Sequence, residues 1–351
     1  MVRSWKVILI LLSTVLPCYF LFHRLQPAHH RSLTTKSTMP PAECSHLKSL
    51  ILNSVMKIFQ RKVFFEVVKA LQGCPWKEDY IERSLLKEKF GNCCNASFSM
   101  IVTQENTPIG HTINYDGMKG QKSVTQSLHS LFPKKSPFQN PIRNCAVVGN
   151  GGILNNSFCG AEIDRADFVF RLNLPPLNWT DDVGTKTDVV TANPSILIDR
   201  FNSLREKRKP FITWIKNYGS TLIILPAFSY LPNTDVSLRT LYTIEDFDLN
   251  SKVVFFNPDY LRNLTTYWKD MGIKSSRLSS GLMLVSAAIE ICEKVTLYGF
   301  WPFSHSLDGV PILHHYYDNI LPKPVHSMPT EFYQYLQMHV QGTLRLKLEQ
   351  C

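Results

Sequence analysis

The stretch 145–176 constrains the fold of this chain more than any other, because two short apolar runs in it each lead to an asparagine. Ala146–Val148 precedes Asn150, and Phe168–Phe170 precedes Asn173. This is the pattern of buried strands that end in tight turns. The carboxyl edge of an open α/β sheet is where ligands bind, so we expect both asparagines to face a ligand. An ordinary strand–turn–helix connection is the alternative.

Glycines follow the first of these strands, at Gly149, Gly151 and Gly152. Glycines at this place often let main-chain N–H groups face a phosphate. A dinucleotide fingerprint would need a further glycine at position 154, where the chain has Leu154. The pattern therefore does not favour NAD as a ligand.

The net charge of +10 over 351 residues implies anionic partners, such as sugar nucleotides, acidic glycans, lipid headgroups or nucleic acid. The basic clusters are short, as at Lys134-Lys135 and Arg205–Lys209, and no RNA-binding signature occurs. We therefore expect no nucleic-acid partner. An apolar content of 44% is that of a globular protein, which excludes a polytopic membrane protein and a disordered chain.

Nine cysteines indicate an oxidising compartment, and no CxxC pair suggests a zinc ribbon. Cys18 lies in an apolar run, which leaves an even number for disulfides. Adjacent cysteines rarely pair with each other, so we expect Cys93 and Cys94 to bond to different partners, such as Cys74 and Cys44. Asn-x-Ser/Thr sequons, which agree with a secretory route, occur at Asn95, Asn155, Asn178 and Asn263.

The N-terminus predicts a membrane anchor with the rest of the chain in the lumen. Val7–Phe22 is an apolar run of about 16 residues that ends in bulky side chains instead of a small-x-small cleavage site. We therefore predict an uncleaved signal anchor over a cleaved signal peptide. Residues 1–6 would be a cytoplasmic tail, and residues 23–72 a polar stem with one or two amphipathic helices at Leu47–Leu71. Residues 73–351 would form a lumenal catalytic domain.

From residue 144 onward, short apolar runs alternate with helical patterns, which predicts an α/β fold with a mostly parallel sheet flanked by helices. Gly110–Pro141 is rich in turn residues and predicts a loop, and Ile81–Phe90 predicts a helix. The further strands are expected at Val189–Val190, Thr221–Leu225, Val253–Phe256 and Val295–Tyr298, and the helices at Ile196–Lys207, Asp259–Met271, Gly281–Cys292 and Glu331–Gln341.

A second informative stretch is Leu278–Phe303. Ser279, Ser280 and Gly281 are placed to cap the helix that follows them. A free helix N-terminus also receives anions, which is the functional interpretation of the same residues. Trp301 follows a strand, so its ring either stacks on a base or sugar or closes the core.

Two histidine-bearing segments come next. His315 lies in the run His314–Asn319, where no third metal ligand stands at zinc spacing, so we expect it to donate to a leaving phosphate. His326 lies in a loop just before a helix whose first turn holds Glu331. A histidine in that position suits a general base, with a purely structural histidine as the alternative.

These four stretches, in this order and spacing, resemble the sialylmotifs L, S, III and VS of animal sialyltransferases. The forms NCAVVGNGGIL, GFWPF and HHYYDN are similar to those of the alpha-2,8-sialyltransferase family, and the resemblance covers roughly residues 74–351. The segment Ile113–Asn144 lacks the strongly basic character of the polysialylating branch. The chain therefore resembles the branch that makes di- or oligosialyl structures.

The resemblance implies a modified Rossmann-like fold, a variant of the GT-A class, in a Golgi enzyme with a single membrane anchor. It implies inverting transfer from CMP-sialic acid onto a sialylated O-glycoprotein or ganglioside, with no metal and no cofactor. His326 would be the general base. It implies disulfides Cys145–Cys292 and Cys159–Cys351. The donor would contact Asn150, Asn173, Ser279, Ser280, Gly281, Trp301 and His315.

The chain departs from the family at Leu172, where a cysteine is frequent, and at Ser280, where threonine is common. A glycan on Asn155 would crowd the donor site, so we expect glycans on Asn95, Asn178 and Asn263 only. Two alternatives remain open. One is a metal-dependent enzyme that uses the DxD spacing of Asp246-Phe247-Asp248, and the other is a Golgi-anchored sialoglycan-binding protein without catalysis.

Overall fold

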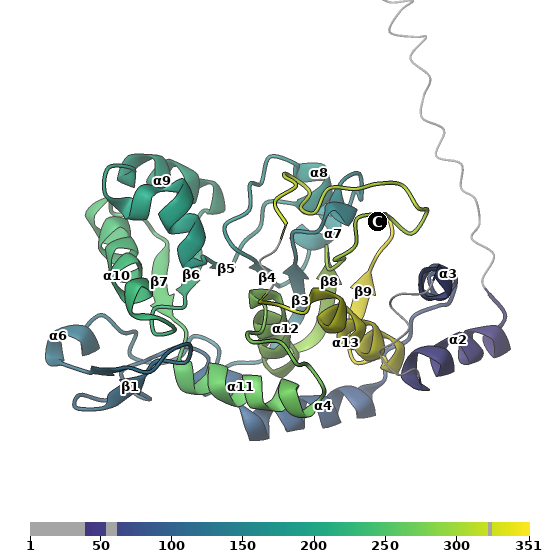
Figure 1. Cartoon of the computed structure of the whole chain (residues 1–351), viewed down its shortest axis with the longest axis horizontal. Helices are drawn as coiled ribbons and strands as arrows, with labels where there is room; N and C mark the ends of the chain where they lie inside the picture. Colours follow the sequence, from purple (N-terminus) through teal and green to yellow (C-terminus); the bar gives the residue numbers. More distant parts are fainter. Residues whose placement is uncertain (1–38, 54–61, 322–324) are drawn as a thin grey trace, which may run out of the picture. The chain divides into compact units, whose positions relative to one another are not determined.

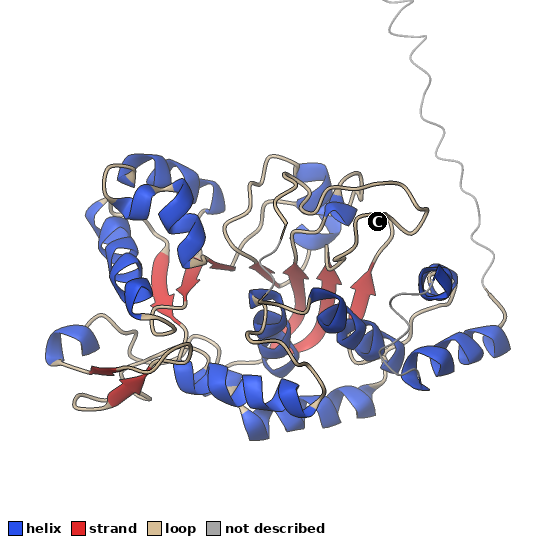
Figure 2. Cartoon of the chain, viewed as in Figure 1, coloured by secondary structure: helices blue, strands red, loops and turns tan. Residues whose placement is uncertain are grey.

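Seven parallel strands form the central sheet, in the order β7-β6-β5-β4-β3-β8-β9 (Figures 1 and 2). From β3 the chain adds β4 to β7 on one side, and then returns to place β8 and β9 on the other side. The switch point between β3 and β8 is where an open α/β sheet binds ligands. The strands are β3 Ile142–Val148, β4 Phe168–Arg171, β5 Val189–Thr191, β6 Leu222–Leu225, β7 Lys252–Phe255, β8 Cys292–Tyr298 and β9 Arg345–Lys347.

The computed structural model describes residues 39–53, 62–321 and 325–351. The described residues belong to the compact unit Met39–Cys351. The anchor predicted at Val7–Phe22 lies outside the described residues. None of the helices in the described ranges is long and apolar enough to cross a bilayer.

Helices cover both faces of the sheet, and the central strand β3 has buried apolar residues on both of its sides. Cys145 and Val147 of β3 pack with α12 (Ser280–Ile291) and α13 (Met328–Gln341). Ala146 and Val148 pack on the opposite face with α7 (Gly160–Asp164). The core on the side of α12 and α13 also includes residues of α2 (Pro41–Asn53), α3 (Lys62–Leu71), α4 (Tyr80–Cys93) and α11 (Pro258–Asp270).

The predicted α/β class and mostly parallel sheet are confirmed, whereas several details of the sequence-based assignment are wrong or incomplete. The helix predicted at Ile196–Lys207 is broken, because Asn202, Ser203 and Leu204 all have positive φ. A π-helical turn, η3 (Ile196–Arg200), and a 3-10 turn, η4 (Asn202–Leu204), take its place. The sequence also did not predict β9, α9 (Arg208–Ile215) or α10 (Leu231–Asp246).

The predicted loop Gly110–Pro141 is also more ordered than expected. It contains a hairpin of β1 (Thr112–Asn114) and β2 (Gln121–Ser123), followed by the short helix α6 (Gln126–His129). The remaining short helices are α5 (Ala96–Ser99), α8 (Thr180–Val183), η2 (Gly152–Leu154) and η5 (Lys216–Tyr218).

Disulfides tie distant parts of the unit together. Cys145–Cys292 joins β3 to the first residue of β8, and Cys159–Cys351 holds the end of the chain beside α7. These are the two pairings that the family resemblance implied. The expectation for the other cysteines is wrong, because the structure pairs Cys93 with Cys94 and Cys44 with Cys74. A backbone hydrogen bond from Met39 to Gly73, 3.2 Å long, brings the segments of Cys44 and Cys74 together.

Candidate active site

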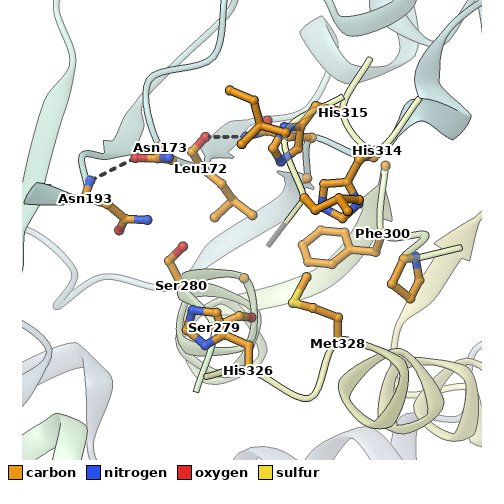
Figure 3. Close-up of a pocket in the computed structure, with 18 of the residues that line it drawn as sticks. Leu172, Asn173, Asn193, Ser279, Ser280, Phe300, His314, His315, His326 and Met328 are labelled. Carbon is orange, nitrogen blue, oxygen red and sulfur yellow. Dashed lines mark hydrogen bonds between the residues drawn. The ribbon is translucent and has the colours of Figure 1, made fainter. Parts of the chain in front are cut away.

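A cavity of about 500 Å³ opens at the carboxyl ends of β3, β4, β5 and β8 (Figure 3). This size suits a small-molecule ligand, and the place is the one that the sheet topology favours. The cavity brings together all eight residues that the sequence nominated for donor binding or catalysis, which are Asn150, Asn173, Ser279, Ser280, Gly281, Trp301, His315 and His326.

The glycines after β3 do not form the phosphate cradle that their pattern suggested. The N–H groups of Gly149, Gly151 and Gly152 donate to backbone carbonyls, at 2.7, 2.9 and 3.2 Å. Because these donors are already used, they are not free for a phosphate. The glycines instead allow close packing: a Cβ on Gly152 would lie 2.0 Å from the carbonyl oxygen of Leu313. They hold the β3 turn against the loops that carry Trp301 and His315.

The two asparagines differ in how much of their hydrogen-bonding capacity the protein uses. Asn150 donates from Nδ2 to the carbonyl of Leu172 at 2.9 Å, and its buried Oδ1 has no partner among the described residues. Asn173 accepts the backbone N–H of Asn193 on Oδ1 at 2.9 Å, as Figure 3 shows. The unmet acceptor of Asn150 is thus available to a ligand donor, and Asn173 retains its amide N–H₂.

The N-terminus of α12 faces the cavity with free donors. Ser279 caps the helix, since its Oγ accepts the N–H of Leu282 at 3.1 Å. The N–H groups of Ser280 and Gly281 precede the first intrahelical bonds, as in any α-helix. The capping interpretation is therefore confirmed, whereas anion binding by the N–H donors and positive dipole of the helix end stays a prediction.

A buried carboxylate joins α12 to α13. Glu331 accepts the backbone N–H of Ser279 at 2.9 Å, and the Ser279 hydroxyl also donates to it. Burial raises the pKa of Glu331 to about 7, although both bonds from Ser279 favour the charged form. The sequence placed Glu331 in a first helical turn but gave it no role. The role of Glu331 becomes visible only through its hydrogen-bond partner Ser279, which is 52 residues away in the chain.

His326 is held with one ring nitrogen toward the protein. Its Nδ1 lies 3.0 Å from the carbonyl oxygen of Arg277, which can only accept a hydrogen bond. Nδ1 therefore carries the proton in the neutral ring, and Nε2 is left as the basic atom. The loop is fixed on both sides, because Ser276 and Arg277 each donate to the carbonyl of Val325.

His315 is oriented by a carboxylate and an aromatic ring. Its Nδ1 lies 2.7 Å from Oδ1 of Asp318, and its ring stacks on Tyr317 with the centroids 5.2 Å apart. The neighbouring His314 also lines the cavity. Burial lowers the pKa of His314, and the positive charge of His315 adds to this effect. Of the two rings, His315 is thus the one with a carboxylate to support a proton.

Trp301 is mainly a residue of the hydrophobic core. It is 3% exposed, its Nε1–H donates to the carbonyl of His305 at 2.7 Å, and its ring packs edge-on against Phe303 and Phe332. The same residue lines the cavity, so contact with the donor stays a prediction.

The structure does not support the DxD alternative. Asp246 ends α10 and forms an ion pair with Arg208, and neither Asp246 nor Asp248 lines the cavity. No cluster of three or more His, Cys, Asp or Glu side chains suited to a metal occurs in the described ranges. The asparagines of all four sequons are exposed, and none of them lines the cavity, so the expected pattern of glycosylation stays a prediction.

One lining segment escaped the sequence-based analysis. It follows β5 and contributes Asn193, Ser195, Ile196, Asp199 and Arg200 to the cavity wall. The available signal was its place after a predicted strand at the ligand-binding edge of the sheet. Its apolar spacing predicted a helix over most of this segment instead.

Residues 101–343 match the family described as glycosyltransferase family 29 (sialyltransferase). The chain belongs to this family. It is 42% identical to alpha-2,8-sialyltransferase 8F of Mus musculus, over 91% of this chain and 82% of that protein. It is 47% identical to an alpha-N-acetylneuraminide alpha-2,8-sialyltransferase of Xenopus tropicalis, over 80% of this chain and 82% of that protein.

The fold of this sialyltransferase is shared by a mammalian sialyltransferase crystallised in complex with Gal-beta-1-3GalNAc-ortho-nitrophenol. The two chains align with a TM-score of 0.51 and 20% identity, over 75% of this chain and 96% of the other. The predicted sialyltransferase fold and the predicted alpha-2,8-sialyltransferase family are thereby confirmed. The protein is a glycosyltransferase, and neither the non-catalytic nor the DxD alternative is favoured.

Proposed function

We propose that this sialyltransferase transfers sialic acid from CMP-sialic acid in alpha-2,8 linkage onto the terminal sialic acid of an O-glycoprotein or ganglioside. One observation carries the mechanism. The basic Nε2 of His326 belongs to the same cavity as the free N-terminus of α12 and the open acceptor of Asn150. The names of the relatives support the linkage.

The donor would lie at the switch point between β3 and β8. The free N–H groups of Ser280 and Gly281 suit its carboxylate or phosphate, because a helix N-terminus stabilises anions. The buried Oδ1 of Asn150 suits a hydroxyl or amino group of the nucleotide, since it is left without a partner among the described residues. Asn173 would contact the donor through the side-chain N–H₂ that its bond to Asn193 leaves free.

The transfer then needs an in-line attack by the acceptor hydroxyl. Its oxygen forms a bond to the anomeric carbon of the donor sugar, and the bond from that carbon to the phosphate oxygen breaks. CMP leaves with the bonding electrons, and the hydroxyl proton passes to Nε2 of His326. His315 would donate a hydrogen bond to the departing phosphate, supported by Asp318. The proposed reaction inverts the configuration at the anomeric carbon, and none of its steps uses a metal.

The location of the enzyme follows from the N-terminus. Val7–Phe22 would anchor it in the Golgi membrane as a single-pass type II protein, with the catalytic domain in the lumen. The disulfides of the described unit suit an oxidising compartment.

A transfer assay with labelled CMP-sialic acid tests the proposal. The acceptors are a sialylated glycolipid, a sialylated O-glycoprotein and the desialylated form of each, and the linkage of every product is determined. We expect alpha-2,8-linked product from at least one sialylated acceptor and none from its desialylated form. Product with another linkage, or transfer to desialylated acceptors alone, would contradict the proposed function.

A further inference from the structure

The proposed reaction brings two carboxylates into one cavity, one on the donor sugar and one on the acceptor sugar. The donor side offers neutral groups, namely the end of α12 and two asparagines. Among the described residues that line the cavity, Arg200 alone is a lysine or arginine. The histidines are poor substitutes, because His326 must be neutral to act as a base, His315 is assigned to the departing phosphate, and burial lowers the pKa of His314.

The guanidinium of Arg200 is stacked on an aromatic ring, and its N–H groups form no hydrogen bond or ion pair with the described residues. It lies over the ring of Trp214, 3.6 Å from the ring centroid. Trp214 is in turn fixed by a hydrogen bond from Nε1 to the carbonyl of Leu174, at 3.3 Å. Asp199 also lines the cavity, yet no ion pair forms between Asp199 and Arg200. A guanidinium that stacks on a ring through its face leaves the N–H groups along its edge free to donate to a carboxylate.

Arg200 follows a different strand from the groups expected to hold the donor, although its charge partly offsets the rise that burial causes in the pKa of Tyr317, whose ring stacks on His315. It ends η3, which follows β5, whereas the donor site lies at the switch point between β3 and β8. β5 is two strands from β3, a separation of roughly 10 Å at ordinary strand spacing. Asn173 lies between the two places, because it follows β4 and bonds to Asn193.

We propose that Arg200 binds the carboxylate of the acceptor sialic acid, and so makes the enzyme select acceptors that already end in sialic acid. This inference rests on the proposed function and names the group that sets its acceptor specificity. A desialylated acceptor has no charge to pair with Arg200. Because Arg200 is exposed, it stays hydrated beside such an acceptor and gives it no charge-assisted hydrogen bond, so the acceptor binds more weakly.

The test compares one sialylated acceptor with the methyl ester of its terminal sialic acid, which has lost the charge. We expect the wild-type enzyme to favour the acid by about ten- to a hundredfold in kcat/KM, mostly through KM, as for a charge-assisted hydrogen bond. The Arg200→Gln variant should use acid and ester equally well. Its KM for CMP-sialic acid and its inhibition by CMP should be unchanged. Arg205→Gln, an exposed change in the same segment, should behave as wild type.

The outcomes separate the two proposals. A wild-type enzyme that does not transfer to the sialylated acceptor overturns the proposed function and this inference with it. An active wild type whose preference for the acid survives in Arg200→Gln overturns the Arg200 assignment alone. Weaker inhibition by CMP in the variant also overturns it, because Arg200 would then contact the donor. If Arg200→Gln does not fold, Arg200→Lys serves instead: an intermediate preference supports the assignment, and an unchanged one contradicts it.

Discussion

The carboxylate of Glu331 accepts the backbone N–H of Ser279 at 2.9 Å, in a site where Glu331 is only 1% exposed. This bond fixes the start of α12, whose free N–H groups face the cavity, against the start of α13, which the His326 loop precedes. One buried residue thus sets the distance between the predicted donor site and the predicted base.

The first prediction concerns Glu331→Gln. The pKa of Glu331 is raised from 4.5 to about 7, so burial favours the protonated form. Its contribution to stability is therefore complete below pH 4.5 and is lost as the pH rises through about 7. Relative to Glu331→Gln, the wild type should lose about 3 kcal/mol of unfolding free energy between these limits. Denaturant unfolding at a series of pH values measures this, and parallel curves for the two proteins would contradict it.

The second prediction concerns the glycines after β3. Gly152→Ala should destabilise the fold by about 1–3 kcal/mol or more, because the new methyl group would overlap the Leu313 carbonyl. It should also lower transfer, since the displaced loop carries His315. Gly91→Ala is the matched control: it lies in α4 with no atom within 4 Å of the added carbon, and should stabilise by about 0.5–1 kcal/mol. Equal melting temperatures for the two variants would be the contrary result.

The third prediction compares two disulfides by the length of chain that each one closes. The Cys159–Cys351 bond spans 192 residues, whereas Cys93–Cys94 spans one. Cys351→Ser should cost about 2–5 kcal/mol of unfolding free energy, because the unfolded chain regains the freedom that this long loop had removed, although Cys145–Cys292 still restricts part of it. Replacing Cys93 and Cys94 together by serine should cost far less. Denaturant unfolding of the purified enzyme and its variants checks this order, and a larger loss of unfolding free energy in the double variant would contradict it.

The fourth prediction addresses metal use. Asp246→Asn and Asp248→Asn should leave transfer within about twofold of wild type, because both residues lie outside the cavity and Asp246 is paired with Arg208 at the surface. Transfer should also persist after dialysis against EDTA. Activity that is lost with EDTA and restored by a divalent cation would show that the reaction needs a metal.

The sequence predicted the sheet well because its strands are short apolar runs with turn residues after them. Asn150 and Asn173 were found for the same reason: each follows such a run, and parallel strands bring their carboxyl ends to one edge. The residue pattern already suggested roles for His315 and His326, the family resemblance implied the same roles, and both roles stay predictions.

The features that the sequence did not reveal depend on contacts between distant residues. The apolar spacing of the segment after β5 suggested a helix, and it does not show that Asn202–Leu204 adopt positive φ. Because of this wrong assignment, Arg200 was not predicted to line the cavity. The role of Glu331 depends on Ser279, and the N–H groups of Gly149 and Gly151 are used by loops that come much later in the chain.

Replacing His326 by alanine, and measuring transfer together with CMP binding, tests the central claim most directly. The ring lies in the cavity, and its Nδ1 bond to Arg277 leaves Nε2 as the base. We expect kcat to fall by about 10²–10⁴-fold, as for loss of a general base, while the affinity for CMP stays within a few fold of wild type. Transfer at the wild-type rate by a folded His326→Ala enzyme would show that His326 is not the base.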